Sequence, residues 1–373
     1  MKIGITCYPT AGGSGVVATE LGLEMARRGH QVHFVSYAAP VRLSSYQDNV
    51  YYHSVDVSAY PLFKYPPYDI ALASRMAEVI AADQLDILHV HYAIPHAICA
   101  YLAKHMLPAA GTKIITTLHG TDITLVGAER SYFGITKFAI ENSDGVTAVS
   151  NYLRDKTHSI FGIHRDIEVI YNFVDTGIFQ KATCADIRAN FARPDEKIIM
   201  HISNMRPVKR VTDVIKAFDL IQKQVPSRLL MIGEGQDRRK AEDLAKQLEI
   251  SSRIVFLGNQ DDIPALLCAA DIFLLPSEFE TFGLAALEAM ACEVPPLVTS
   301  NGGTTELIRH GEDGFLFQVG DFEGMAAKAV ALLQNDDLRR TIGLHARQRV
   351  QDNFRLDILA DRYEDYYRDI IQA

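Results

Sequence analysis

Short apolar segments alternate with helical segments along the chain, and this alternation limits the folds that the chain can adopt. An apolar run at residues 2–7 is followed by a glycine-containing loop, a helical segment at about 16–28 and a second apolar run at 32–37. This order of strand, helix and strand predicts a parallel sheet that is covered by helices. Further strands of the first half are expected at residues 87–91, 113–118 and 145–149, with helices at 68–83 and 95–106.

The same pattern restarts after a break at residues 167–175. More strands, each followed by a helix, are expected at residues 197–202, 228–232, 254–257, 272–275 and 296–299. A chain of 373 residues is long enough for two domains with separate cores. We therefore expect an α/β protein with two doubly wound, Rossmann-like domains that face a cleft. The first comprises residues 1–168, joined by a terminal helix at about 355–373, and the second comprises residues 169–354.

Composition excludes several classes of protein. The net charge of −9 argues against a nucleic-acid-binding protein. No apolar run is long enough to span a membrane, and the chain begins directly with a strand, without a signal peptide. The five cysteines lack paired spacing, which is typical of free thiols in a reducing compartment. We expect a cytoplasmic protein, with a homodimer as one candidate for its assembly.

Ligands of open α/β sheets bind at the carboxyl ends of the strands, so the loops there are the candidate sites. One such loop, after the strand at 272–275, carries Glu280, and Glu288 lies about one turn inside the next helix. Carboxylates accept hydrogen bonds from sugar hydroxyls, and the first N–H groups of a helix attract phosphate. This juxtaposition predicts a nucleotide-sugar site.

A cationic loop follows the first strand of the second half. Arg206, Lys209 and Arg210 stand close to an expected helix start, where cations are unfavourable. An anion site that clamps a diphosphate is favoured over a solvated basic surface. For the turn at residues 301–306, two interpretations stay open: it shapes the sugar or phosphate pocket, or it is a plain turn in which Thr304 caps a helix.

The first half offers a glycine loop and several histidines. The loop at residues 10–15 opens a helix and favours ligand contact, although its spacing matches neither the dinucleotide fingerprint nor the P-loop. His119 follows a strand, and two interpretations stay open for it. It bonds a sugar hydroxyl or a developing charge, or it is a structural histidine whose partners all lie within the protein. His89, His91 and His96 suggest metal ligands at first sight, but no further ligand completes a site, so no metal is expected.

These motifs together resemble a known family of enzymes. Glu280 and Glu288 around Phe282-Gly283, with the glycine loop, the His119 turn and the cationic loop, resemble the retaining GT4 glycosyltransferases, which have the GT-B fold. Residues 5–9, 12–17, 89–97 and 116–122 resemble more closely the N-acetyl-α-D-glucosaminyl L-malate synthases of bacillithiol biosynthesis. Those enzymes join GlcNAc from UDP-GlcNAc to the hydroxyl of L-malate and release UDP. The resemblance spans essentially the whole chain.

The resemblance implies a role for each motif residue. Glu288 is expected to hold the ribose hydroxyls, Glu280 the sugar 3-hydroxyl, and His119 the sugar near its 6-hydroxyl. Arg206 and Lys209 are expected to neutralise the leaving diphosphate. The other donor-site residues implied are Gly13, Ser203, Asn204, Phe282, Gly283 and Leu284. The malate pocket is expected to include Ser14, Tyr92 and Thr117, with Lys137 as the cation for the dicarboxylate.

Two positions depart from the family pattern. The family usually has Gly-Arg where this chain has Ser203-Asn204, so Arg206 is expected to replace the usual arginine. Glu293 stands where a glycine usually ends a helix, and a local change without loss of activity is expected.

The implied chemistry is a front-face displacement of UDP with retention, in which no cofactor or divalent metal is required. Three alternatives remain: a GT4 enzyme with another acceptor, such as inositol phosphate or a lipid-linked sugar; a UDP-sugar epimerase of the same architecture; or a sugar-binding protein.

Overall fold

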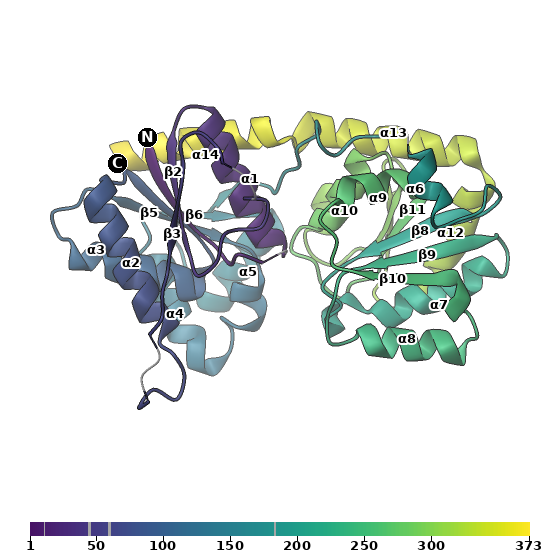
Figure 1. Ribbon diagram of the computed structural model, residues 1–373, viewed down its shortest axis with the longest axis horizontal. Helices are drawn as coiled ribbons and strands as arrows, with labels where there is room; N and C mark the ends of the chain where they lie inside the picture. The colour runs from purple at the N-terminus through teal and green to yellow at the C-terminus, as the bar shows by residue number, and fades with distance from the viewer. Residues whose placement is uncertain (11, 44–45, 59–60, 183) are drawn as a thin grey trace. The chain divides into compact units, whose positions relative to one another are not determined.

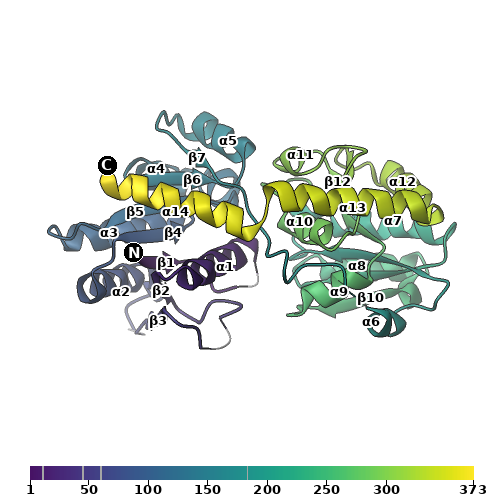
Figure 2. The ribbon, with the colours of Figure 1, turned by 90° about the horizontal axis from the view of Figure 1, so that it is seen from above.

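The computed structural model describes residues 1–10, 12–43, 46–58, 61–182 and 184–373. The chain divides into two compact units. Unit 1 comprises residues 1–172 and 356–373, and unit 2 comprises residues 173–355 (Figures 1 and 2). Both units are parallel sheets with helices on their faces, so the predicted α/β class is confirmed.

In the described residues, the sheet of unit 1 has seven strands in the order β3-β2-β1-β4-β5-β6-β7. Every neighbouring pair is parallel. The central strands are buried on both faces, which explains their continuous apolar sequences. The strands are β1 (Lys2–Thr6), β2 (Gln31–Ser36), β3 (Val50–Ser54), β4 (Ile87–His91), β5 (Lys113–Leu118), β6 (Gly145–Ala148) and β7 (Glu168–Val169).

The helices of unit 1 connect these strands. They are α1 (Gly13–Arg27), α2 (Tyr68–Asp83), α3 (Ile98–Met106), α4 (Arg130–Glu141), α5 (Asn151–Phe161) and α14 (Leu356–Gln372). Short π-helical turns at Ala93–Ala97 and Thr121–Leu125 follow β4 and β5. The helix predicted at 95–106 begins only at Ile98, because Ile94 is extended before Pro95.

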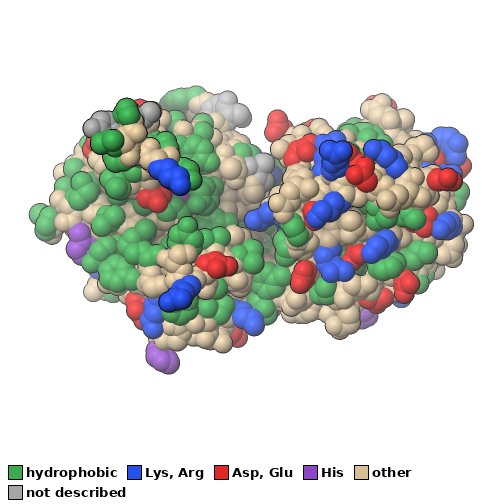
Figure 3. Space-filling model, turned by 90° about the horizontal axis from the view of Figure 1, so that it is seen from below, with side chains coloured by type: hydrophobic (Ala, Val, Ile, Leu, Met, Phe, Trp, Pro, Cys, Tyr) green, Lys and Arg blue, Asp and Glu red, His purple; other side chains and the backbone are tan. Residues whose placement is uncertain are grey.

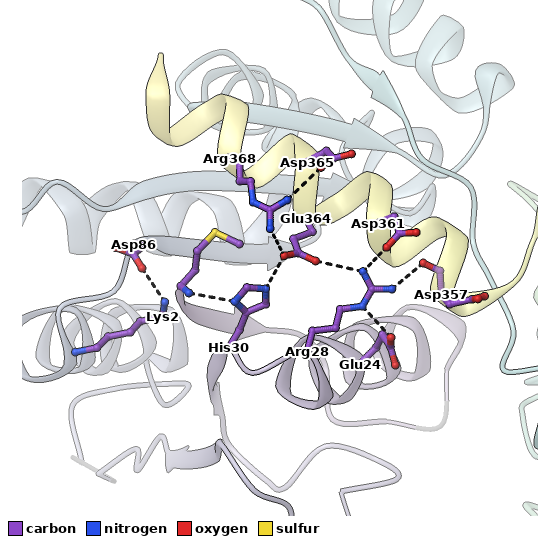
Figure 4. Close-up of polar contacts among 11 residues, drawn as sticks. Lys2, Glu24, Arg28, His30, Asp86, Asp357, Asp361, Glu364, Asp365 and Arg368 are labelled. Atoms are coloured by element: carbon purple, nitrogen blue, oxygen red, sulfur yellow. Dashed lines mark hydrogen bonds and ion pairs between the residues drawn. The ribbon is translucent and has the colours of Figure 1, made fainter.

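The last helix, α14, belongs to unit 1 although unit 2 precedes it in the sequence. Arg28, just after α1, donates to Asp361 at 2.6 Å and to Glu364 at 3.2 Å. His30 lies between the N-terminal amino group and Glu364, at 3.1 and 3.0 Å. Figure 4 shows these side chains converging from α1, β1 and α14. The polar network therefore fixes the terminal helix to the beginning of the chain.

Unit 2 repeats the same architecture with fewer strands. Its described sheet has the order β10-β9-β8-β11-β12-β13, and all neighbouring pairs are parallel. The strands are β8 (Lys197–Ile202), β9 (Ser227–Ile232), β10 (Ile254–Gly258), β11 (Ile272–Leu275), β12 (Pro296–Thr299) and β13 (Phe315–Phe317). The helices are α6 (Ala185–Ala189), α7 (Val211–Gln222), α8 (Arg238–Gln247), α9 (Ile263–Ala269), α10 (Leu284–Ala291), α11 (Thr304–Leu307), α12 (Phe322–Gln334) and α13 (Asp336–Asn353), with 3₁₀ turns at Pro207–Lys209 and Ser251–Arg253.

Each sheet has one point where the chain reverses its direction of travel. In unit 1 this switch point lies between β1 and β4, and in unit 2 it lies between β8 and β11. Helices leave the two strands toward opposite faces there, which opens a crevice at the carboxyl ends of the strands. The loops after β1, β4, β8 and β11 are therefore the positions where each unit can bind a ligand.

The sequence did not predict three edge strands. Strand β3 is largely exposed, and β7 and β13 are only two and three residues long. Short or half-exposed strands lack the apolar run that identifies a buried one. Strand β7 lies inside the segment that was expected to be a linker.

Glu293 shows the local change expected at the end of α10. Its φ is +61°, the left-handed conformation that glycine adopts without strain. The carbonyl of Glu293 also lies only 2.3 Å from where a Cβ at Gly343 would stand. The turn is therefore kept in place by close packing against α13.

The two units present different surfaces in Figure 3. The visible face of unit 1 is rich in apolar side chains, whereas unit 2 shows many charged ones. Charges on α8 are paired along the helix, for example Arg238 with Glu242 at 2.8 Å. None of the helices in the described part of the chain is both long enough and apolar enough to cross a membrane.

Candidate active site

Lys209 and Glu280 meet across the switch point of unit 2. Lys209 ends the 3₁₀ turn after β8, and Glu280 lies in the loop after β11. The Lys209 Nζ is 2.6 Å from the Glu280 Oε1, and both side chains are largely buried. The Ser277 hydroxyl donates to the same carboxylate oxygen at 2.8 Å. A predicted diphosphate-binding cation and a predicted sugar-binding carboxylate thus form one hydrogen-bonded pair.

The backbone of Glu280 is held from both sides by the turn at 301–303. The Gly303 N–H donates to the Glu280 carbonyl at 2.9 Å, and the Glu280 N–H donates to the Asn301 carbonyl at 3.3 Å. Gly302 has a φ of +100°, and a Cβ there would lie 1.9 Å from the Glu280 carbonyl oxygen. Only glycine fits this approach. The turn therefore positions Glu280, which agrees with the interpretation that it shapes the sugar pocket; its contact with Glu280 was not predicted.

The alternative in which Thr304 caps a helix is wrong. Helix α11 is preceded by Gly303, which makes no side-chain cap. The Thr304 hydroxyl donates instead to the Thr299 carbonyl at 2.7 Å. This bond ties the start of α11 back to the end of β12.

The segment after β8 is ordered by a buried histidine. The His201 Nδ1 donates to the Leu274 carbonyl at 2.8 Å, and its Nε2 is 2.7 Å from the Ser203 hydroxyl. Burial is the main cause that lowers the pKa of His201 to about 4, and the charge of Lys209 adds to it. A neutral His201 accepts from Ser203 through Nε2, and the Ser203 oxygen accepts from the Met205 N–H at 3.2 Å. Ser203 therefore shapes the loop through its hydroxyl.

Arg206 is exposed at the tip of this loop. When the Asn204 amide points its oxygen toward the guanidinium, it accepts from Nε and Nη2 of Arg206 at 3.0 Å each. Asn204 therefore restrains the arginine that was expected to replace the family's usual one. The carbonyl of Asn204 lies so close to Gly235 that a Cβ there would be 2.0 Å away.

The N-terminus of α10 follows the Glu280 loop directly. Gly283 is its cap, with a φ of +98°, and Leu284 is the first helical residue. The Phe282 side chain is buried and packs edge-on against Phe354 at 5.6 Å. Glu288 lies one turn into the helix and is buried. Phe282 thus anchors the helix start, so that its N–H groups are available as phosphate donors.

Three predicted residues of unit 1 meet at its own switch point. The Ser14 hydroxyl, at the start of α1, donates to the Tyr92 hydroxyl at 3.2 Å. The Tyr92 ring lies 5.4 Å from the His119 ring, centroid to centroid. Tyr92 has a φ of +92°, a strained conformation for a tyrosine that is typical of functional loops. Gly13 is the first, exposed residue of α1, and Ala11 of the same loop lies outside the described residues.

His119 is held by a second histidine. Its Nε2 is 2.8 Å from the Nδ1 of His91, and the two rings are stacked at 5.1 Å. Burial lowers the pKa of His119 to about 3 and lowers that of His91 well below its usual value. His119 is therefore a neutral imidazole at physiological pH, able to exchange hydrogen bonds with a hydroxyl.

Asp122 organises the turn after β5 and was not identified from the sequence. Its carboxylate accepts from the N–H groups of Gly120 at 2.8 Å, His119 at 3.2 Å and Ala93 at 2.9 Å. Burial raises its pKa to about 6 despite these bonds. The spacing of an aspartate two residues after a glycine was the available signal, since such side chains commonly bond nearby N–H groups.

The side chains of two other residues predicted for the malate pocket have partners within the protein. Thr117 is fully buried within the sheet, where its hydroxyl bonds His89 and Thr147 at 2.6 Å each. Strand alternation turns this side chain into the protein, so in this structure it lines no open surface. Lys137 lies on α4 and pairs with Glu141 of the same helix at 3.8 Å.

His89 of β4 and His96 of the turn that follows it contact other parts of the protein. The two ring nitrogens of His89 are 2.6 Å from the hydroxyls of Tyr367 and Thr117, so neither remains for a metal. His96 packs on Tyr8 at 4.6 Å and contacts the His91 carbonyl through Nδ1. The terminal helix α14 thus supplies Tyr367 as a hydrogen-bond partner to His89 of β4.

We expect acid to weaken the folding of unit 1. Burial lowers the pKa values of His89, His96 and His119 to about 3 or 4, below the usual 6.5. Between pH 6.5 and 4 the unfolded chain therefore binds more protons than the native chain, and stability falls as the pH falls. At pH 5 each of these histidines lowers the stability by roughly 2 kcal/mol, and the raised pKa of Asp122 offsets roughly 1 kcal/mol of the total. The urea midpoint, followed by circular dichroism at pH 7 and pH 5, measures this loss; equal midpoints would contradict it.

Comparison with known proteins identifies the family. Residues 11–177 match the family described as Glycosyltransferase Family 4, and residues 185–349 match Glycosyl transferases group 1. The N-acetyl-α-D-glucosaminyl L-malate synthase of Bacillus anthracis is 48% identical over 373 residues, covering 100% of this chain and 98% of that protein. A GDP-mannose-dependent phosphatidylinositol monomannoside mannosyltransferase of Mycobacterium tuberculosis is 25% identical, covering 79% of this chain and 78% of that protein.

Solved structures show the same fold. Sucrose-phosphate synthase from Thermosynechococcus elongatus superposes with a TM-score of 0.84 at 20% identity, covering 100% of this chain and 99% of that one. HepE from Anabaena, solved with UDP-glucose, gives 0.84 at 19% identity, covering 99% and 100%. The two-sheet architecture, the loops at both switch points and these likenesses agree with one another: the chain belongs to the family 4 glycosyltransferases and is a hexosyltransferase of the GT-B fold.

Proposed function

We propose that this enzyme transfers N-acetylglucosamine from UDP-GlcNAc to the hydroxyl of L-malate, with retention at the anomeric carbon, as the first step of bacillithiol biosynthesis. The observation that carries the proposal is the 48% identity, over the whole chain, to a protein named for this product. The relatives with about 25% identity include a mannosyltransferase that acts on a phosphatidylinositol mannoside. Acceptors of that kind are therefore the second candidate.

The proposal assigns the donor to unit 2. Glu288 holds the ribose hydroxyls and Glu280 the sugar 3-hydroxyl, because carboxylates accept hydrogen bonds from polyols. The N–H groups at the start of α10 bind the phosphates. The Lys209 ammonium group, which pairs with Glu280, also interacts with the diphosphate. Arg206 adds a second cation from the exposed tip of its loop.

The reaction breaks the bond between the anomeric carbon and the β-phosphate oxygen. On the same face, the malate hydroxyl oxygen forms the new bond, and the departing phosphate oxygen takes the hydroxyl proton. The transition state has oxocarbenium character, and negative charge grows on the diphosphate. Fixed cations and helix N–H groups stabilise that charge most effectively because they need no rearrangement. We propose that they do so without a divalent metal.

The proposal assigns the acceptor to unit 1. Ser14 and Tyr92 bond each other and can offer hydroxyl groups to a carboxylate. His119, neutral and stacked on His91, is proposed to contact the sugar near its 6-hydroxyl. With Lys137 paired to Glu141, its role as the dicarboxylate cation rests on the sequence resemblance alone.

UDP release from UDP-GlcNAc tests the proposal, with L-malate, succinate, inositol phosphate or no acceptor present. Succinate keeps both carboxylates but lacks the hydroxyl, so it is a matched control. We expect UDP release with L-malate only, and a product whose anomeric proton shows the α configuration by NMR. UDP release without an acceptor, together with an altered sugar, would identify an epimerase. Release only with inositol phosphate would identify the second candidate, and no UDP release under any condition would identify a binding protein.

A further inference from the structure

A cluster of metal-ligand side chains lies in unit 1, outside the residues of the proposed reaction. His33 of β2, His53 of β3 and Asp83 at the end of α2 place three ligand-type atoms within 4.8 Å of one another. None of the catalytic or binding roles given above involves these residues. The cluster therefore needs its own explanation.

The strand register brings the two imidazoles together. Parallel pairing places His33 opposite Tyr51 and Val35 opposite His53. Alternate residues of a strand share one face, so His33 and His53 project from the same side of the sheet. Their rings are stacked, with centroids 5.2 Å apart and an interplanar angle of 13°. The Tyr51 ring also stacks on His33, at 4.7 Å, and fixes its orientation.

The three ligand atoms lie close enough together to share one metal ion, although the two histidines also form a hydrogen bond. The Nδ1 of His33 is 3.0 Å from the Nε2 of His53. The Asp83 Oδ2 is 3.6 Å from the first nitrogen and 4.0 Å from the second, beyond ordinary hydrogen-bond length. Ligand atoms of a tetrahedral zinc site lie about 3.3 Å from one another, given zinc–ligand distances of about 2.0–2.1 Å. Two sides of the observed triangle, 3.0 and 3.6 Å, lie close to this spacing, and the third, 4.0 Å, is longer, so Asp83 would move slightly toward His53 when an ion binds.

Electrostatics also favour a cation at this point. Asp83 is the last residue of α2, where the helix dipole is negative, and no basic residue lies in that last turn. A carboxylate in this position is unfavourable unless a positive charge accompanies it. Lys2 supplies part of this charge, since its Nζ donates to the backbone carbonyl of Asp83 at 2.8 Å, while the Asp83 carboxylate faces the two histidines.

The exposed fraction of the side chain increases from His33 to His53 to Asp83. The His33 side chain is 3% exposed, His53 is 18% exposed and Asp83 is 34% exposed. An ion can therefore enter from solvent past Asp83 and meet a rigid, buried nitrogen at the far side. Asp83 precedes β4 and Lys2 begins β1, so the cluster borders the amino-terminal side of the sheet, opposite the loops of the active site.

We propose that His33, His53 and Asp83 bind a divalent transition-metal ion of the zinc class, with water as the fourth ligand. Two imidazole nitrogens and one carboxylate oxygen form a donor set that zinc commonly accepts. The ion would join the end of α2 to the edge strand β3. Its effect would be on stability, because the cluster lies away from the residues that act on substrates.

Isothermal titration of the full-length, chelator-treated protein with zinc chloride tests this site. We expect one zinc per chain, and the melting temperature should rise with zinc concentration, as binding to the native state requires. His53→Ala and Asp83→Asn should each weaken binding by about tenfold or more, since each removes one of three protein ligands. These two residues are partly exposed, so the variants avoid the packing loss expected of a His33 substitution. His345→Ala, which removes an exposed histidine of unit 2, is the control and should bind like wild type.

The metal's coordination provides a second readout. Cobalt(II) in the same site should show the intense visible bands of a tetrahedral complex without a thiolate charge-transfer band, which separates this cluster from the five cysteines. Catalytic turnover should not change when zinc is added. Equal zinc affinity in wild type, His53→Ala and Asp83→Asn would overturn the proposal, as would no binding at millimolar zinc. Loss of binding in the control variant would also overturn it.

Discussion

Lys209→Ala is expected to lower the turnover number for UDP release by about 10²–10³-fold while the fold persists. The Lys209 Nζ is the only described lysine nitrogen paired with Glu280, at 2.6 Å, and it lies at the switch point of unit 2. Removing a fixed cation at a developing charge typically costs about 3–4 kcal/mol of transition-state stabilisation. The change also leaves the largely buried Glu280 without its counter-charge. Turnover is measured by coupled UDP detection at saturating UDP-GlcNAc, and folding by circular dichroism.

Lys216→Ala is the matched control. Lys216 lies on α7 of the same unit, pairs with Asp213 at 3.3 Å and is 43% exposed, so its loss should leave turnover unchanged. Adding Glu280→Gln to Lys209→Ala separates the two effects of the lysine. If Lys209 acts on the diphosphate, the double variant is no faster than Lys209→Ala, whereas a lysine that only neutralises Glu280 predicts that turnover recovers in the double variant. Turnover of Lys209→Ala within a few-fold of wild type would contradict the role.

Gly302→Ala is expected to abolish most of the activity, by about 10²-fold or more, without touching any substrate-binding side chain. A Cβ at this position would lie 1.9 Å from the Glu280 carbonyl oxygen, so the Glu280 loop has to move. Displacing a binding group by about 1 Å can reduce a rate by about 10²-fold. Both KM for UDP-GlcNAc and the turnover number should change, because a displaced Glu280 holds the sugar less tightly and also orients it wrongly for the transition state.

Gly311→Ala separates steric displacement from backbone strain. Gly311 also has a positive φ, +85°, but no atom lies within 4 Å of the added Cβ. This variant should lose about 1–2 kcal/mol of stability from the left-handed conformation and keep its activity. If the two variants have the same activity, the close contact between Gly302 and Glu280 is not what positions the sugar site.

The sequence predicted the buried strands better than the edges of the sheets. Strands such as β4 and β11 are continuous apolar runs because helices cover both faces, and their bounds match the prediction. Helices α2 and α14 also have the predicted bounds. Strand β3 escaped prediction because its side chains are mostly exposed and carry no apolar run. Its pairing with β2 is a tertiary contact, and that contact creates the His33–His53 pair.

Motif residues were predictable for the candidate site, but their partners were not. The sequence places Lys209 and Glu280 in separate loops, and only the adjacency of β8 and β11 brings them together. In the sequence Gly302 looks like any turn glycine, and only the structure shows that the backbone of Glu280 lies directly against it. Thr117 was expected in the acceptor pocket because the family resemblance implied it, and the sequence did not show which way its side chain points. Strand alternation turns its hydroxyl toward His89 instead.

The return of α14 to unit 1 has a consequence for how the protein is made. Unit 1 is continuous in space but interrupted in sequence, since unit 2 separates residue 172 from residue 356. Tyr363 and Tyr367 are fully buried in unit 1, and Tyr367 bonds His89 of β4. A ribosome therefore releases all of unit 2 before it supplies the helix that completes unit 1. The nascent first domain must wait, with the part of its sheet that α14 covers still exposed, until the last residues emerge.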